Sequence, residues 1–156
     1  MCIDIAMIIQ SIPQVAKCIS PNCRLKATTK QYVIELLGIT CNKIMSNYKT
    51  TVDAAVRDSF IGEVAPHALA EGHKAVSTEG KKLLFKVQDV RKGFLNKDLS
   101  ANELIFLTAV LEYITWEVFE VGSFVTQTSN RKLITPEDIK TAFITDDEIR
   151  KSIFTE

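Results

Sequence analysis

Histidine and cysteine are the side chains of this chain best suited to acid–base or metal chemistry near neutral pH. The two histidines, His67 and His73, stand six residues apart on a helical stretch, and neither has a serine or cysteine nucleophile in register. The sequence contains no HExxH motif, phosphate-binding glycine loop or GxGxxG motif. We therefore expect no catalytic residue and no enzyme, with one histidine packed on its helix and the other exposed.

The cysteines are Cys2, Cys18, Cys23 and Cys41, all in the first third of the chain. They form no CxxC pair, and no histidine lies nearby at the spacing that a zinc site needs. We interpret them as reduced thiols in or beside a helical core. Neither a metal nor a cofactor is expected.

The composition is that of an ordinary globular domain, with 46% hydrophobic and 24% charged residues. The formal net charge is zero, which counts against a generic nucleic-acid binder. The chain has no apolar run long enough for a membrane span, and its first residues lack the basic start and cleavage site of a signal peptide. We expect a soluble protein that is not secreted.

The second half of the chain has the periodicity of three helices in the order short, long, short. Apolar residues recur at alternating steps of three and four over 104–125, which predicts an amphipathic helix of about 25 residues. A shorter helical segment precedes it at about 85–95. After it, Thr135-Pro136 is an N-cap followed by proline at the first helical position.

The first half repeats this plan. Helical patterns are expected over 3–18, 33–48, 51–60 and 63–76, and a polar linker follows at 77–82. The first two helices are joined by a loop with a turn-forming Ser-Pro-Asn. A short-long-short unit exposes too much apolar surface to stand alone, so the two units must pack long helix across long helix.

Two segments of the second half resemble histone 2A. Residues 107–118 (LTAVLEYITWEV) are similar to its central helix, and residues 146–149 (DDEI) to the acidic segment that follows its third helix. Phe85, Val87 and Val90 also fit its first helix.

The first half resembles histone 2B. Residues 55–57 (AVR) and 62–76 (GEVAPHALAEGHKAV) are similar to its third helix and its extra C-terminal helix, and the loop at 20–22 (SPN) also fits. The order 2B then 2A in one polypeptide is that of the histone doublets of the marseillevirus group of giant DNA viruses. Over nearly its whole length the chain resembles such a viral doublet, in a short form without tails.

The resemblance implies an all-α protein made of two tandem histone folds (helix-loop-long helix-loop-helix) in an intramolecular handshake pair. The expected domains are a 2B-like fold with its extra helix at 1–78, a linker at 79–82, and a 2A-like fold at 83–156. The 2A-like fold would lack the C-terminal docking extension of histone 2A, and the chain would lack long basic tails. A weaker grip on DNA is then expected. The central helix of the first half would also be shortened.

The resemblance further implies three groups of residues that contact DNA phosphates. In the family, the two folds clasp antiparallel, so the first loop of one half meets the second loop of the other. Cations, hydroxyls and N–H groups near helix N-termini hold phosphates there without reading bases. The expected contacts are Asn22, Arg24, Lys26 and Thr28 beside Asn130, Arg131 and Lys132; Asn96 and Lys97 beside Lys49, Thr50 and Thr51; and Lys86, Arg91 and Lys92 on the second half's first helix. Taken without the resemblance, these are ordinary solvated loop charges.

Acidic side chains match the positions that form the acidic patch of a 2A–2B pair, a docking site for basic, arginine-bearing peptides. They are Glu63, Glu71, Glu112, Glu117, Glu120, Asp146, Asp147 and Glu148. Taken one at a time, each is a solvated helix-face carboxylate.

The resemblance implies a structural chromatin protein without a membrane role. Its partners would be double-stranded DNA, which it binds without sequence specificity, and a histone 3–4 type doublet or pair. The product would be a nucleosome-like particle that packages viral DNA in the virion and in the viral factory or host nucleus.

Two other functions fit the same fold. A histone-fold protein-interaction module, as in Sos-type signalling proteins, is favoured by the zero net charge. A histone-fold transcription subunit would share the loops but not the acidic set.

Overall fold

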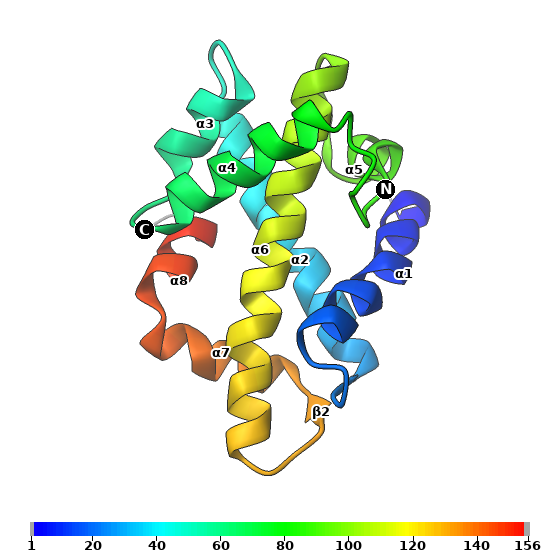
Figure 1. The fold of residues 1–156 in the computed structure, drawn as a ribbon, viewed down its shortest axis with the longest axis vertical. Coiled ribbons are helices and arrows are strands. Elements are labelled where there is room, and N and C mark those ends of the chain that lie inside the picture. Colours follow the sequence, from blue (N-terminus) through cyan, green and yellow to red (C-terminus); the bar gives the residue numbers. More distant parts are fainter. Residues whose placement is uncertain (1, 155–156) are drawn as a thin grey trace.

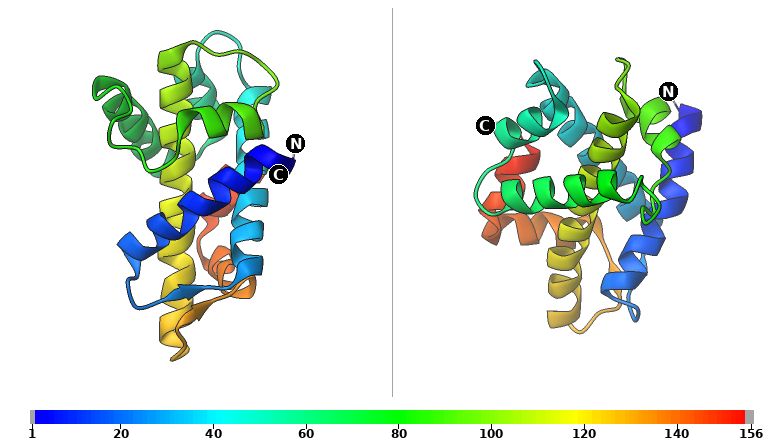
Figure 2. Two further views of the ribbon diagram at one scale, coloured as in Figure 1. Left: turned by 90° about the vertical axis from the view of Figure 1, so that its right-hand side faces the viewer. Right: turned by 45° about the horizontal axis from the view of Figure 1, so that its top comes forward.

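A computed structural model describes residues 2–154, with side chains from residue 10 onward, and shows eight α-helices and two short strands. Figures 1 and 2 show the arrangement of these elements. In chain order they are α1 (Cys2–Ile19), β1 (Arg24–Leu25), α2 (Ala27–Ser46), α3 (Val52–Ser59), α4 (Val64–Ser77), α5 (Val87–Phe94), α6 (Ala101–Thr128), β2 (Leu133–Ile134), α7 (Pro136–Thr145) and α8 (Asp147–Ile153).

Helix α6 is the axis of the molecule and runs along most of its length (Figure 1). It begins where the Ser100 hydroxyl accepts a hydrogen bond of 3.2 Å from the N–H of Glu103. Residues 106–112 are buried on every side of the helix, as expected of a stretch that is apolar nearly all round. The buried hydroxyl of Thr108 donates to the carbonyl one turn earlier, and that of Thr115 does the same, so neither is left without a partner.

The two halves of the chain share one core. Helix α2 crosses behind α6, and α1 packs against α5 (Figures 1 and 2). Buried apolar side chains of both halves, such as Leu37 and Ile44 of α2 and Leu111 and Ile114 of α6, belong to a single cluster. The predicted fold, two histone folds in an intramolecular handshake, is confirmed. Helix α2 has 20 residues against 28 in α6, in line with the shortened first central helix that we expected.

One end of the handshake is closed by strands that the sequence analysis did not predict. β1 and β2 pair in parallel, with Arg24 opposite Leu133 and Leu25 opposite Ile134. The buried hydroxyl of Thr29 donates to the carbonyl of Ile134 at 2.7 Å and strengthens the same junction. This end lies at the foot of Figure 1, and the α2–α3 loop lies at the opposite end.

Helix α4 lies across α6, where its small residues allow a close approach. A Cβ on Gly72 would meet the ring of Phe106, so only glycine fits this crossing without rearrangement. The chain then passes through a loop at 78–86, polar up to Lys82 and apolar over 83–85, to α5, which starts at Val87 rather than at Phe85.

The acidic segment after α7 differs from the prediction, because it forms a further helix. Asp146 caps α8 by accepting a hydrogen bond of 3.3 Å from the N–H of Ile149. Helix α8 packs against α2, α4, α6 and α7, with Ile149 and Ile153 buried. No helix within residues 2–154 is long and apolar enough to cross a membrane.

Candidate functional site

The strand-end cluster is the set of predicted contact residues gathered by β1 and β2. It consists of Asn22, Arg24, Lys26, Thr28, Asn130, Arg131 and Lys132, all exposed. The N–H of Arg24 donates to the carbonyl of Lys132 at 2.7 Å, and the N–H of Lys26 donates to that of Ile134 at 3.3 Å. Two loops more than a hundred residues apart therefore lie side by side, as the antiparallel clasp requires.

Arg131 differs from its neighbours because its guanidinium is already paired. It donates two hydrogen bonds to the carboxylate of Asp138, one of them at 3.0 Å. Burial works to raise the pKa of Asp138, but bonds from Arg131, Thr126 and the N–H of Thr135 outweigh it and hold this pKa at about 2. Arg131 therefore clamps the start of α7, and Arg24, Lys26 and Lys132 carry the unpaired positive charge of the cluster within the described residues.

The N-terminus of α2 is the open helix end of this cluster. No side chain caps it, and its first turn contains no acidic residue, so its N–H groups and positive dipole end face outward beside Thr28. The start of α7 differs, because Thr135 and Asp138 form a capping box there. An anion at this end of the molecule would therefore meet α2 rather than α7.

The far-end cluster consists of Lys49, Thr50, Thr51, Asn96 and Lys97, and all five are exposed. The ammonium of Lys97 lies 4.4 Å from the centroid of the Tyr48 ring, which joins the two loops.

Hydrogen-bond acceptors of the protein itself lie within and beside the far-end cluster. The Tyr48 hydroxyl donates to the carboxylate of Glu103 at 3.1 Å, and that carboxylate also accepts the N–H of Val52 at 3.3 Å. The Thr51 hydroxyl caps α3 by accepting the N–H of Ala54. With a carboxylate inside it, this cluster is the weaker of the two for phosphate.

Lys86, Arg91 and Lys92 lie on or just before α5 and are exposed. The Arg91 Nε donates to the side-chain oxygen of Gln88 at 2.8 Å, which orders that side chain along the helix. These cations belong to neither loop cluster and sit between the two ends, where α5 packs on α1.

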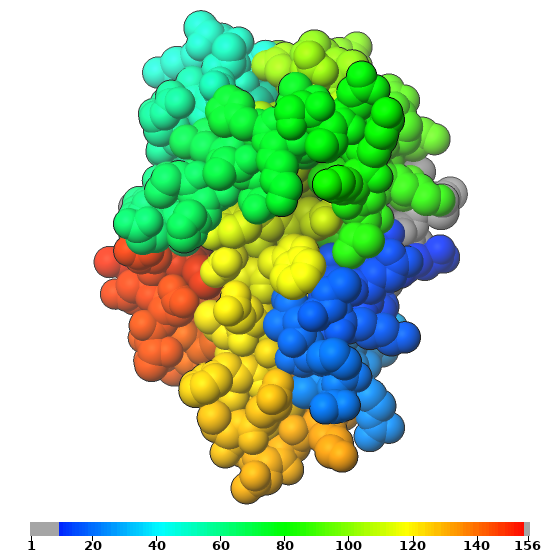
Figure 3. Space-filling model, viewed as in Figure 1, coloured from blue at the N-terminus to red at the C-terminus, as the bar shows by residue number. Residues whose placement is uncertain are grey.

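Five of the eight predicted acidic residues line one groove along α6, which we call the acidic groove: Glu71, Glu112, Glu117, Glu120 and Asp146. Two adjoining hollows of about 430 and 450 Å³ share Glu117 and Glu120. Figure 3 shows the face on which α6 is visible between α4, α1 and the α7–α8 segment.

Glu112 forms the inner wall of the groove and holds the polar loop between the two halves. Its carboxylate accepts the N–H of Leu84 at 2.9 Å and the N–H of Phe85 at 3.1 Å. Burial raises the pKa of Glu112 against these two hydrogen bonds, which work to lower it. This side chain therefore has a structural role besides any role in docking.

Glu117 is the central carboxylate of the groove. Burial and the charge of Glu120 raise its pKa, while a hydrogen bond from the Tyr113 hydroxyl works to lower it. A carboxylate that is poorly solvated and surrounded by like charge gains most from an added cation.

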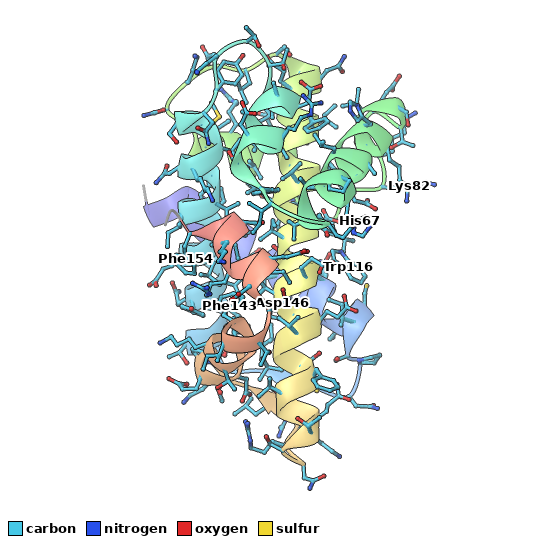
Figure 4. All side chains as sticks on the ribbon, turned by 90° about the vertical axis from the view of Figure 1, so that its left-hand side faces the viewer. His67, Lys82, Trp116, Phe143, Asp146 and Phe154 are labelled. Carbon is cyan, nitrogen blue, oxygen red and sulfur yellow. The ribbon has the colours of Figure 1, made fainter. Side chains whose placement is uncertain are left out.

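Glu63, Asp147 and Glu148 lie outside the groove. The carboxylate of Glu148 accepts the N–H of Glu63 at 3.1 Å, and Asp147 is paired with Arg150 at 3.0 Å. Asp147 and Glu148 are both on α8, beside Asp146. Figure 4 shows Asp146 between α7 and α8, and Trp116 on α6.

The histidines and cysteines are the other side chains whose types could do chemistry. Both histidines are exposed on α4, rather than one of them as expected, although the His73 ring meets Phe106 edge-to-face at 5.1 Å between centroids. Cys41 is buried, which raises the pKa of its thiol to about 12. Cys18 and Cys23 are unpaired, and Cys2 lies where side chains are not described. No group of three or more metal-binding side chains occurs in the described part of the chain.

Sequence reasoning missed two aromatic side chains of the acidic groove. Tyr113 and Trp116 both line the hollow of about 430 Å³, and the sequence analysis named neither as a site residue. Their spacing contained the signal. Trp116 lies one helical turn from both Glu112 and Glu120, so all three share one face of α6.

Comparison with known proteins finds relatives that are histones and one, Protein son of sevenless, whose name is not that of a histone. A histone 2A-like protein of Mus musculus is 35% identical over 80 residues, which is 50% of this chain and 76% of that protein. Histone 2B.v1 of Dictyostelium discoideum is 25% identical over an alignment of 184 residues, covering 88% of this chain and 81% of that protein. Protein son of sevenless of Drosophila melanogaster is 26% identical over 139 residues, which is 83% of this chain but 9% of that protein. No protein-family model matches the chain.

Proposed function

This chain belongs to the histone family, and on that premise we propose that it is a fused 2B–2A pair that binds DNA in chromatin. It holds DNA by its phosphates, without sequence specificity, and assembles with a 3–4 type histone partner into a nucleosome-like particle. Both histone relatives support a fused pair, because similarity to a 2A-like protein covers half of the chain and similarity to a 2B protein covers most of it.

The observation that carries this proposal is the strand-end cluster. Arg24, Lys26 and Lys132 are exposed, unpaired among the described residues, and brought together around the open N-terminus of α2. Point charges and N–H groups in this arrangement suit phosphate oxygens and read no base. Because α6 has 28 residues and a helix rises by about 1.5 Å per residue, the two loop clusters lie about 40 Å apart, enough to hold a bent duplex at both ends.

The finer identity is part of the same proposal. The 2B-then-2A order within one chain supports a viral histone doublet, which acts in the virion and in the viral factory or host nucleus. The predicted division into 1–78, 79–82 and 83–156 belongs to this proposal as well.

The acidic groove is the proposed docking site for basic peptides of partner proteins. Its carboxylates lie on α6 and at the end of α7 in the 2A-like half and on α4 of the 2B-like half, so the site exists only in the assembled pair. Arginine side chains are suited to it, because a guanidinium donates in a fork that matches carboxylate geometry.

Reconstitution on DNA tests the packaging function. The chain is mixed with a 3–4 type doublet and a DNA fragment, and micrococcal nuclease digestion should leave a protected fragment of defined length. Charge reversal of Arg24, Lys26 and Lys132 to glutamate should abolish the protection. Matched reversal of Lys74, Lys81 and Lys82, which lie on α4 and the following loop, should leave it intact. Absence of protection by the unaltered chain at low salt would contradict the proposal.

A second function is favoured by two observations. Similarity to Protein son of sevenless covers 83% of this chain, and the formal net charge is zero. In this alternative, the same fold is a protein-interaction module that has no DNA partner. The two functions separate in a gel-shift titration at low salt, because only a histone pair used in packaging binds duplex DNA there.

A further inference from the structure

We propose that Trp116 makes the acidic groove selective for arginine over lysine, by stacking its indole ring on the guanidinium of a docked basic peptide. This inference rests on the proposed role of the groove as a docking site and names the side chain that the groove prefers. Trp116 is then a specificity-determining residue of the groove.

The hollow lined by Trp116 has an aromatic and aliphatic wall within its acidic rim. Tyr113 and Trp116 come from α6, Ala75 from α4, and Leu83 from the loop between the halves. The volume of about 430 Å³ accepts a long side chain together with adjacent peptide backbone. Figure 4 shows Trp116 projecting from α6 on the same side of the molecule as Lys82, another residue of this wall.

The carboxylates surround Trp116 at helical spacing. Glu112 lies four residues before it and Glu120 four residues after it, so the indole sits one turn from a carboxylate in each direction along α6. Because one oxygen of Glu112 already accepts the N–H groups of Leu84 and Phe85, Glu117 and Glu120, which line the same hollow as Trp116, are the carboxylates most open to a cation.

The groove is not neutralised from within the described chain. No ion pair joins Glu71, Glu117 or Glu120 to a cationic side chain among residues 10–154. Lys74 and Lys82 line the same hollow without reaching ion-pair distance of these carboxylates. The negative charge is therefore available to a cation supplied by a partner.

The wall decides which cation is preferred. A guanidinium is planar, weakly hydrated and able to stack on an aromatic face while it donates to carboxylates at its edge. An ammonium is compact and strongly hydrated, so it loses more solvation in a half-buried aromatic hollow. An acidic patch without the indole would attract both cations through charge alone.

The test uses two synthetic peptides that are identical except for a single arginine or lysine at the centre of a short basic sequence. Trp116 is the only tryptophan of the chain, so its fluorescence reports contact with the peptide directly. We expect the arginine peptide to quench this fluorescence and to bind about fivefold more tightly than the lysine peptide, the ratio expected of a cation–π contact.

Variants separate this inference from the docking function, with affinities measured by calorimetry. Trp116→Leu should reduce the difference between the two peptides to less than about twofold, while Trp116→Phe should retain part of it. Ile144→Ala is the control, because Ile144 is 78% exposed on α7 and lines neither hollow of the groove. Glu117→Gln should weaken both peptides alike.

The outcomes are distinct. If both peptides bind but Trp116→Leu keeps the arginine preference, the role of Trp116 is overturned and docking stands. If neither peptide binds at low salt, or Glu117→Gln changes neither affinity, docking in the groove fails and the inference fails with it. Circular dichroism of each variant shows whether the fold is retained.

Discussion

The ammonium group of Lys43 on α2 donates a hydrogen bond of 3.0 Å to the carbonyl oxygen of Phe154, just past the end of α8. The same ammonium also donates to the carbonyls of Lys151 at 2.7 Å and Ser152 at 3.3 Å. A lysine of the 2B-like half therefore caps the last helix of the 2A-like half, where the helix dipole is negative.

Replacement of Lys43 by methionine should lower the free energy of unfolding by about 1–2 kcal/mol, because charge-assisted bonds to helix carbonyls are lost. Urea denaturation followed by circular dichroism measures the change. Lys30→Met, on the same helix but without an ion pair among the described residues, should change stability by less than about 0.5 kcal/mol. Equal losses in the two variants would contradict the cap.

Asp138 should make the protein sensitive to acid. Its folded pKa of about 2 lies below its ordinary value of 3.8, so its ionised form stabilises the fold above about pH 4, and this stabilisation is lost as the pH falls towards 2. The contribution at neutral pH is about 2 kcal/mol. Asp138→Asn should make the free energy of unfolding nearly independent of pH between pH 4 and 2, as measured by urea denaturation. Glu137→Gln, which alters a neighbour in the first turn of α7, should leave the pH dependence as steep as in the unaltered chain.

Gly62 should not tolerate a side chain. Its φ of +57° is left-handed, and a Cβ there would collide with the carboxylate of Glu148. Gly62→Ala should cost about 1–3 kcal/mol, and adding Glu148→Ala should recover only the part due to the collision. Gly38→Ala is the control, because that Cβ meets only ordinary contacts in a helix interior, and a gain of about 0.5–1 kcal/mol is expected. Chemical denaturation of the four proteins gives these differences.

The two ends of the molecule should contribute unequally to DNA affinity. In the strand-end cluster, Arg24→Gln with Lys132→Gln should reduce the slope of log K against log salt by about 1–2. Lys49→Gln with Lys97→Gln should reduce it by less than about 1, because Lys97 rests on Tyr48 and Glu103 lies close by. Salt titrations by fluorescence anisotropy give both slopes. A larger loss at the far end would contradict the ranking.

The helices were predictable because their apolar spacing and caps are local. The repeat over 104–125 lies within α6, and Thr135-Pro136 is the capped start of α7. The handshake followed from the amount of apolar surface on the long helices. The resemblance to histones supplied the pairing of the loops, which β1 and β2 place side by side.

What escaped prediction depends on contacts between distant residues. Nothing local to Lys43 indicates that it caps α8, and nothing local to Glu112 indicates that it holds Leu84 and Phe85. Likewise, nothing local to Arg131 indicates that it pairs with Asp138 at the start of α7. The strands β1 and β2 are two residues each, too short for any periodicity to appear.

The chain runs without a break from α4 to α5, and Glu112 holds this connection on α6. The unbroken chain also fixes the ratio in which the two halves are made. One round of translation delivers both halves in a one-to-one ratio, and dilution does not separate them, because their association is intramolecular. Neither half is left over to pair with an unrelated histone. An assembly that takes up this chain receives a complete pair in a single step.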